Sequence, residues 1–386
     1  MPRVLRIINR FNLGGPTFNA SYLTAYMLPE FETRLIGGSP LPDEAHSGFI
    51  PQKLGIEIIE IPEMSRSINP LNDIRAWLKI RKIIRDFKPD IVHTHASKAG
   101  ALGRSAAIFS GVPVIVHTYH GHVFSGYFSP LKSKIVRGLE RTLCRKTDAI
   151  VTISKKQYRE IVDEFKICDP KKAHIIPLGL DLSRFAESQD IKRTQFRKTF
   201  GIADHQIAIG IIGRIVPIKN HKLFVEAVCI AQQKCNHDIV PVIIGDGNEK
   251  QSLIDLFDQL RDKNKPEPIF TSWIKDVDEA LSGLDIVALT SINEGTPVSL
   301  IEAQAASRPV ISTNVGGVAD CMLNGKSGIV IDDFNKETFA DGLFKLANDS
   351  DLRKTMGLEG NQFVNHNFSY TRLVDDMKTL YHSLLK

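Results

Sequence analysis

The stretch Asn293-Glu294-Gly295-Thr296-Pro297-Val298-Ser299-Leu300-Ile301-Glu302-Ala303 stands between two short apolar runs, 285–290 and 310–313. Both runs have the length and composition of buried strands. Between them, a Gly/Pro turn is followed by a helical pattern, and Pro297 fits the first helical turn, where its missing N–H is not needed. The order strand, turn, helix, strand predicts a βαβ unit of a parallel sheet.

Two glutamates flank the start of this expected helix. Glu294 lies in the turn at the carboxyl end of the strand, where open α/β sheets bind ligands, and Glu302 lies within the helix. The helix N-terminus offers N–H groups and partial positive charge to a phosphate. Because a carboxylate is repelled by phosphate, we expect one glutamate to bind a sugar beyond the phosphate and the other a ribose before it. The alternative is a helix-start glutamate and a solvated glutamate, neither of which has a function.

Length and composition describe an ordinary globular protein with room for two domains. The chain has 386 residues, of which 42% are hydrophobic and 24% are charged. No apolar run approaches a membrane span, and the N-terminus enters a strand without a signal peptide. The five cysteines form no CxxC motif, so we expect a cytoplasmic protein. The net charge of +5 suits anionic small molecules or a membrane surface and is too weak to indicate nucleic acid.

Apolar runs alternate with helical patterns along the whole chain, which predicts an α/β fold with parallel sheets covered by helices on both faces. The polar stretch 187–193 separates two halves of similar architecture. We therefore expect an N-terminal domain over residues 1–183 and a second domain over 184–368. A C-terminal helix occupies 369–386.

The first half contains two further candidate elements. Gly14-Gly15 follows the first strand and lets the backbone approach a ligand closely, although the G-x-G-x-x-G spacing of dinucleotide sites is absent and an ordinary turn is the alternative. His120 follows a strand near 114–118. Zinc is an alternative use of the histidines here, but alternate strand residues point to opposite faces. The candidate zinc ligands are His93, His95, His120 and His122.

In the second half, Arg214 and Lys219 flank one strand-to-helix turn. A guanidinium and an ammonium group there suit the oxygens of a diphosphate, while two solvated surface cations are the alternative. Asp276-Val277-Asp278 matches the DxD pattern of metal-dependent sugar transferases. We interpret it instead as acidic residues at a helix N-terminus.

These motifs closely resemble family 4 of the glycosyltransferases, which are retaining enzymes of the GT-B fold with two Rossmann-like domains facing each other across a cleft. The resemblance covers nearly the whole chain. Its most specific part is 294–303, supported by Gly213-Arg214, Lys219-Asn220, Gly245-Asp246-Gly247 and Thr118-Tyr119-His120-Gly121. The stretch 93–103 is similar to bacterial members that build polysaccharides on lipid carriers. In the resembled family the C-terminal helix packs back on the N-terminal domain.

The resemblance implies a role for each matching residue. Glu294 should bind hydroxyls of the donor sugar, and Glu302 the ribose. Arg214 and Lys219 should hold the diphosphate, assisted by the backbone of the loop and by Gly15. His120 should lie beside the transferred sugar, and the backbone at Ile274 should contact the base. The expected catalytic residues are His120, Arg214, Lys219 and Glu294. The expected donor-binding residues are Gly15, Arg214, Lys219, Ile274, Glu294, Gly295, Thr296, Pro297, Val298, Ser299 and Glu302.

The implied activity is retaining, metal-independent transfer of a hexose or N-acetylhexosamine-type sugar from a nucleoside diphosphate, with UDP as the expected nucleotide. The acceptor would be a hydroxyl of a lipid-linked glycan intermediate of surface polysaccharide synthesis. No cofactor or metal is expected. Two alternatives remain: a nucleotide-sugar epimerase on the same fold, and a non-catalytic nucleotide-binding protein.

A basic helix expected at about 130–146 gives a candidate membrane contact on the inner face of the cell membrane. Its cations fall on one side and Ile135, Val136, Leu139 and Leu143 on the other. Either the apolar side packs on the sheet and the basic side is merely solvated, or the helix docks on an anionic membrane. The cations of the expected docking face are Lys134, Arg137, Arg141 and Arg145.

Overall fold

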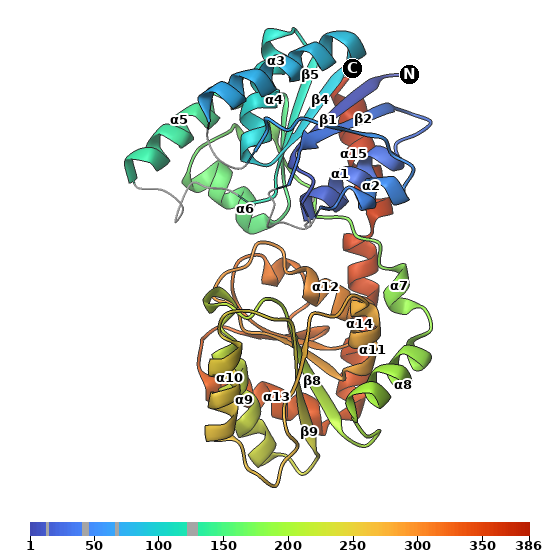
Figure 1. Ribbon diagram of the computed structural model, residues 1–386, viewed down its shortest axis with the longest axis vertical. Coiled ribbons are helices and arrows are strands. Elements are labelled where there is room, and N and C mark those ends of the chain that lie inside the picture. Colours follow the sequence, from blue (N-terminus) through green and yellow to red (C-terminus); the bar gives the residue numbers. More distant parts are fainter. Residues whose placement is uncertain (13–14, 41–45, 66–68, 122–129) are drawn as a thin grey trace. The chain divides into compact units, whose positions relative to one another are not determined.

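The computed structural model describes residues 1–12, 15–40, 46–65, 69–121 and 130–386 (Figure 1). The chain divides into two compact units, one formed by Met1–Leu180 with Phe368–Lys386 and the other by Asp181–Asn367. Within the described residues, none of the helices combines the length and the apolar composition that a membrane span requires.

The first unit contains a seven-stranded parallel sheet in the order β3-β2-β1-β4-β5-β6-β7. Its strands are β1 (Arg3–Arg10), β2 (Glu32–Gly38), β3 (Ile58–Glu60), β4 (Ile91–His95), β5 (Val114–Tyr119), β6 (Ala149–Thr152) and β7 (Ala173–Ile175). Its helices are α1 (Gly15–Ala25), α2 (Phe49–Lys53), α3 (Pro70–Phe87), α4 (Ser97–Phe109), α5 (Pro130–Arg145), α6 (Lys155–Arg159) and α15 (Tyr370–Leu384), and α6 continues into a π-helical turn at Glu160–Glu164.

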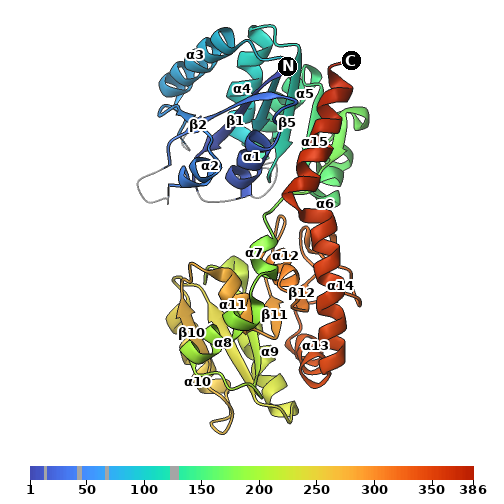
Figure 2. The same ribbon diagram turned by 90° about the vertical axis from the view of Figure 1, so that its right-hand side faces the viewer.

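Alternate residues of these strands face two different cores, as the pleat of a sheet requires. Leu5, Val92 and Ile115 pack with helices α3 and α4 on one face. Val4, Ile91 and Val114 pack on the other face with α1 and with α15, which lies beside α1 in Figures 1 and 2. The C-terminal helix is thus part of the core of the first unit.

The second unit contains a six-stranded parallel sheet in the order β10-β9-β8-β11-β12-β13. Its strands are β8 (Ile207–Ile212), β9 (Ile239–Ile244), β10 (Ile269–Ser272), β11 (Ile286–Leu289), β12 (Val310–Thr313) and β13 (Gly328–Ile331). Its helices are α7 (Ser183–Ala186), α8 (Gln189–Phe200), α9 (His221–Lys234), α10 (Lys250–Leu260), α11 (Val277–Gly283), α12 (Val298–Ala305), α13 (Lys336–Asn348) and α14 (Ser350–Phe368), the last of which leads into α15. The α/β class and the parallel sheets predicted from the sequence are confirmed.

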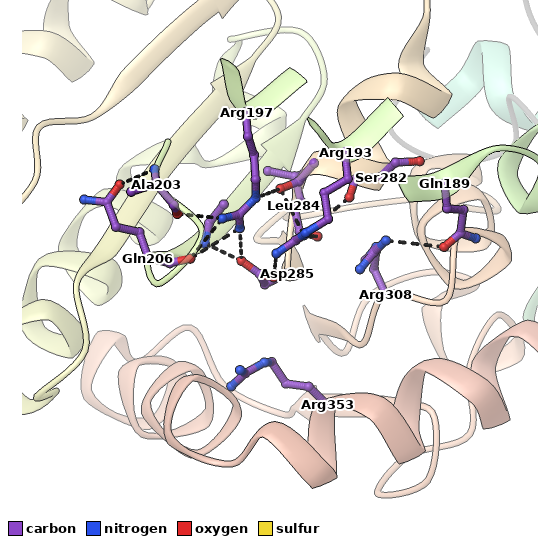
Figure 3. Close-up of polar contacts among 12 residues, drawn as sticks. Gln189, Arg193, Arg197, Ala203, Gln206, Ser282, Leu284, Asp285, Arg308 and Arg353 are labelled. Carbon is purple, nitrogen blue, oxygen red and sulfur yellow. Dashed lines mark hydrogen bonds and ion pairs between the residues drawn. The ribbon is translucent and has the colours of Figure 1, made fainter. Parts of the chain in front are cut away.

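Helix α8 is anchored to the sheet of the second unit by the carboxylate of Asp285, which directly precedes β11. Figure 3 shows Arg193 and Arg197 reaching from α8 to Asp285, with N···O distances of 2.8 and 2.5 Å. Arg197 also donates to the carbonyl oxygen of Gly283 at the end of α11 (3.1 Å), and it is almost fully buried. Because a buried charge needs a paired and hydrogen-bonded partner, these contacts fix α8 against the sheet.

Candidate active site

The loops after β8 and β11 meet at the carboxyl edge of the second sheet, because the two strands are neighbours and run parallel. The backbone N–H of Ile292 donates to the carbonyl oxygen of Ile218 at 2.9 Å. The hydroxyl of Thr290 donates to the carbonyl oxygen of Asn220, also at 2.9 Å. These bonds hold the turn that contains Glu294 against the turn that contains Lys219.

Glu294 and Lys219 are in direct contact. The Nζ of Lys219 lies 2.5 Å from Oε1 of Glu294, and the hydroxyl of Ser291 donates to the same oxygen at 2.6 Å. The Glu294 side chain is 12% exposed and the Lys219 side chain 25% exposed. The sequence predicted that the two would contact different parts of one ligand, and it gave no sign that they pair with each other.

Gly316 makes the backbone at Glu294 possible. Its φ is +57°, and a Cβ at this position would lie 1.6 Å from the carbonyl oxygen of Glu294. Gly317 donates its N–H to the carbonyl oxygen of Gly295 at 2.9 Å. The loop after β12 therefore supports the Glu294 turn from behind, a role for Gly316 that the sequence analysis missed. The sequence signal that could have revealed this role is the pair Gly316-Gly317 shortly after the apolar run 310–313.

Helix α12 begins at Val298, and its N-cap residue, Pro297, makes no side-chain capping hydrogen bond. In the part of the chain that the structure describes, no heavy atom lies within 4 Å of a Cβ added at Gly295. Among the described residues, the buried hydroxyl oxygen of Thr296 has no hydrogen-bond partner. The first N–H groups of a helix have no partners within the helix. The N–H groups of Val298 and Ser299 are thus available as hydrogen-bond donors at the start of α12.

Glu302 lies on the same helix and is half-buried. Burial raises the pKa of its carboxyl group to about 7; Asp278 adds to this rise, and Arg184 opposes it. The Nη2 of Arg184, on α7, lies 3.8 Å from Oε1 of Glu302. Near neutral pH this carboxyl group therefore changes its charge, and a ligand that needs the carboxylate would sense that change.

The remaining predicted residues of the second unit follow the carboxyl ends of its strands. Arg214 is exposed after β8, and Ile274 is half-buried after β10, next to Trp273, which is 62% exposed. Asp276 precedes α11, and Asp278 pairs with Lys192 at 2.9 Å. This placement agrees with a helix N-terminus. Among the described residues, no group of three or more His, Cys, Asp or Glu side chains is placed to hold a metal ion.

In the first unit, His120 follows β5 and contacts His95 at the end of β4. The Nε2 of His120 lies 3.0 Å from Nδ1 of His95. Burial lowers the pKa of His120 to about 4 and that of His95 well below its ordinary value, so both are neutral at physiological pH. The two nitrogens of His93 contact the hydroxyls of Tyr381 and Thr118 and are not free to bind zinc. His122 lies outside the described residues.

Gly15 is the first residue of α1, so it belongs to a helix and not to an ordinary turn. Proline is favoured in the first turn of a helix, and Pro16 explains why the helix starts here. Among the described residues, a Cβ on Gly15 would meet Leu178 alone, at an ordinary 3.8 Å. The partner glycine, Gly14, lies outside the described residues.

Two family models match the chain. Residues 34–184 match Glycosyltransferase Family 4, and residues 192–363 match Glycosyl transferases group 1. A UDP-Gal:alpha-D-GlcNAc-diphosphoundecaprenol alpha-1,3-galactosyltransferase of Escherichia coli is 30% identical over 83% of this chain and 82% of its own length. The chain belongs to the family 4 glycosyltransferases.

Another curated relative and several solved structures are also similar to this glycosyltransferase. The capsular polysaccharide biosynthesis glycosyltransferase CapM of Staphylococcus aureus is 25% identical over 86% of each chain. Among solved structures, a glycosyltransferase from Rickettsia africae superposes with a TM-score of 0.82 at 20% identity, covering 100% of this chain and 99% of that one. HepE of Anabaena in complex with UDP gives 0.81 at 16% identity, covering 99% and 100%. The fold is that of the GT-B glycosyltransferases, as the sequence predicted.

Proposed function

We propose that this glycosyltransferase moves a hexose or N-acetylhexosamine-type sugar from a UDP-sugar to a hydroxyl of a lipid-linked glycan, with retention of configuration, during surface polysaccharide synthesis. The main observation in support is the Lys219–Glu294 pair beside the uncapped start of α12. This arrangement brings a cation, a carboxylate and helix N–H groups together at the carboxyl edge of the second sheet. The name of the E. coli relative gives UDP-Gal as its donor and a diphosphoundecaprenol-linked GlcNAc as its acceptor.

In this proposal, the diphosphate is bound by the cations of the second unit. Arg214 and Lys219 contact its oxygens, and the N–H groups of Val298 and Ser299 complete the anion site. The backbone at Gly15 also contacts the diphosphate in this proposal. Negative charge grows on the leaving UDP as the glycosidic bond breaks, and preorganised cations stabilise that charge most strongly in the transition state. No metal is required in this scheme, because the side-chain cations supply the positive charge.

The other residues bind the organic parts of the donor. Glu294 accepts hydrogen bonds from sugar hydroxyls, Glu302 from the ribose, and the backbone at Ile274 contacts the base. Because Glu294 also holds Lys219, the bound sugar and diphosphate share this ion pair. His120 contacts the transferred sugar from the N-terminal unit. With both glutamates engaged in binding, the departing phosphate itself accepts the proton of the acceptor hydroxyl on the front face, and no glycosyl-enzyme ester forms.

The proposal is tested by incubating the enzyme with UDP-galactose, UDP-glucose, UDP-N-acetylglucosamine or GDP-mannose and a short-chain GlcNAc-diphospholipid. We expect one UDP-sugar to yield UDP and an extended lipid in equal amounts. Interconversion of UDP-sugars without transfer would indicate an epimerase instead. Binding without UDP release or interconversion would indicate a nucleotide-binding protein.

The raised pKa of Glu302 predicts a pH-dependent affinity for the donor. UDP-glucose is a diphosphate diester that does not titrate near neutral pH, so its binding should rise about tenfold from pH 6 to pH 8 as Glu302 ionises through a pKa of about 7. The free energy of unfolding should fall over that range, because the folded protein holds this proton more tightly than the unfolded chain does.

Isothermal titration calorimetry at several pH values measures this effect, and Glu302→Gln is the matched control. The variant should bind UDP-glucose with an affinity that does not change with pH. An equal pH dependence in both proteins would contradict the assignment of Glu302 to the ribose.

We further propose that α5 docks the enzyme on an anionic membrane. The face that the helix buries differs from the expected one: Leu143 is buried and Val136 half-buried, but Ile135 and Leu139 are 64% and 51% exposed. The reason is Glu140, which is buried against Arg104 (2.5 Å) and Tyr119 (2.7 Å) and so sets the rotation of the helix.

The exposed face of α5 therefore combines cations with an apolar stripe. Leu131, Ile135 and Leu139 follow one another at a spacing of four residues, with Lys134 and Arg145 beside them. This composition is typical of helices that lie in a membrane interface. Arg141 donates to the carbonyl oxygens of residues 165 and 166, and Arg137 lies over the Phe165 ring, so these two cations are engaged within the protein. The residues before the helix, 123–128, lie outside the described part.

Co-sedimentation with anionic phosphatidylglycerol vesicles tests this surface. Lys134→Glu/Arg145→Glu should weaken binding at least about tenfold at low salt, because each cation adds about 1 kcal/mol. Leu131→Ser/Ile135→Ser/Leu139→Ser should weaken it even at high salt, where apolar insertion is the remaining contribution. Ile191→Ser, which replaces an equally exposed isoleucine on α8, is the control and should bind normally. If all variants bind like the wild type, α5 is ordinary surface.

A further inference from the structure

Two histidines form a hydrogen-bonded pair at the carboxyl edge of the first sheet. His95 ends β4 and is fully buried, and His120 follows the last residue of β5. Their rings are stacked at 27° with the Nδ1 of His95 3.0 Å from the Nε2 of His120. Among the described residues, the other nitrogens of the pair, His95 Nε2 and His120 Nδ1, are buried and have no hydrogen-bond partner.

The proton count of this pair restricts its tautomers. Burial and the nearby Arg6, His93 and His117 hold the pKa of His95 well below its ordinary value, so neither ring gains a second proton near neutral pH. A hydrogen bond between two neutral imidazoles needs one N–H and one bare nitrogen. Either His95 donates and His120 has its hydrogen on Nδ1, or His120 donates and its Nδ1 is bare.

The surroundings of His95 favour the first arrangement. Arg6 is fully buried, acts electrostatically on His95, and donates hydrogen bonds to Thr24, Met27 and Tyr381, none of which balances its charge. The ring of His95 packs against that of His93, the strand neighbour of Arg6, at a centroid distance of 4.2 Å and a tilt of 33°. The positive charge of Arg6 stabilises an unprotonated Nε2 on His95. An N–H at Nε2 would instead be a donor without a partner in a positive field.

We propose that His95 is a positioning residue that holds His120 as the Nδ1–H tautomer, so that His120 presents an N–H donor to an oxygen of the transferred sugar. The inference rests on the proposed contact of His120 with the donor sugar. It goes further by specifying which ring atom makes that contact and what fixes it. His120 then acts as a neutral donor over the physiological pH range, and its hydrogen-bonding role does not depend on its own titration.

The first test is nuclear magnetic resonance of the full-length enzyme labelled with ¹⁵N in histidine, with the His120 signals identified by their loss in His120→Gln. Protonated and bare imidazole nitrogens resonate far apart. We expect a hydrogen on Nδ1 and a bare Nε2 from pH 6 to pH 8. In His95→Leu the preference should be lost, because the donor to Nε2 is gone, and His95→Asn should restore it by supplying an amide N–H near the former Nδ1. A wild-type His120 with its hydrogen on Nε2, or a tautomer unchanged in His95→Leu, would overturn the inference.

The second test measures turnover of the UDP-sugar identified by the donor panel. Loss of one neutral hydrogen bond should lower kcat about tenfold in His95→Leu with little change in KM, and His95→Asn should recover most of it. Equal kcat losses in the leucine and asparagine variants would contradict a positioning role. The resonance experiment needs no substrate, so it can uphold the tautomer even if the enzyme transfers no sugar from any donor tested.

Discussion

Replacing Lys219 with alanine should lower the rate of sugar transfer by roughly 100-fold or more, the usual effect of removing one preorganised electrostatic group. The Lys219 ammonium is held 2.5 Å from Glu294 by loops that are fastened to each other, so its position does not depend on the ligand. Without it, the leaving diphosphate loses a fixed cation and the Glu294 carboxylate loses its partner. Steady-state rates at saturating UDP-sugar measure the loss, and Arg214→Ala should show a loss of similar size.

Lys234→Ala is the matched control. Lys234 lies at the far end of α9 and pairs with Asp341 at 2.7 Å, so its removal also breaks an ion pair, one that lies away from the strand edge. Its kcat should stay close to that of the wild type. Full activity in Lys219→Ala would mean that this cation does not act on the leaving group.

The second large effect is expected from Glu294, and it should differ from the effect of Glu302. Glu294→Ala should lower turnover by roughly 100-fold and leave the affinity for free UDP close to normal, because the proposed contact is to the sugar. Glu302→Ala should weaken UDP binding itself by about tenfold or more, the scale of hydrogen bonds to a charged group. Calorimetric titration with UDP, alongside turnover, separates the two.

A double-mutant cycle strengthens this prediction. Because Lys219 and Glu294 touch, the losses in Lys219→Ala/Glu294→Ala should add up to clearly less than the sum of the single losses. Fully additive losses would indicate that the two side chains act independently. Normal UDP affinity and normal turnover in both glutamate variants would refute the assignment of the 294–302 segment to the donor.

Local sequence patterns were sufficient for the fold. The short apolar runs before and after 293–303, and Pro297 at the turn, indicated parallel strands around a helix, and β11, α12 and β12 lie there. The Lys219–Glu294 contact was not foreseen, because it depends on β8 and β11 being neighbours, which no local pattern reveals. The strand order is set by how whole βαβ units pack.

The orientation of α5 shows a second limit. Helical periodicity placed Ile135 and Leu139 on the apolar side, yet the buried face is the one that contains Glu140. A buried glutamate is unusual unless it is paired, and its partner, Arg104, lies on another helix. Likewise, the sequence indicates no role for His95 other than that of a candidate zinc ligand, because a strand pattern does not show that its ring contacts His120.

The central claim, retaining transfer from a UDP-sugar to a lipid-linked glycan, is tested most directly by the anomeric configuration of the product. UDP-galactose, in which galactose is α-linked, would be incubated with a short-chain GlcNAc-diphospholipid, and the H1–H2 coupling of the new galactose residue measured by proton resonance. If galactose is not the sugar used, the same measurement applies to the α-linked donor identified by the panel. We predict an α-linked product. A β-linked product, or UDP-sugar consumed without any new glycosidic bond, would contradict the proposal.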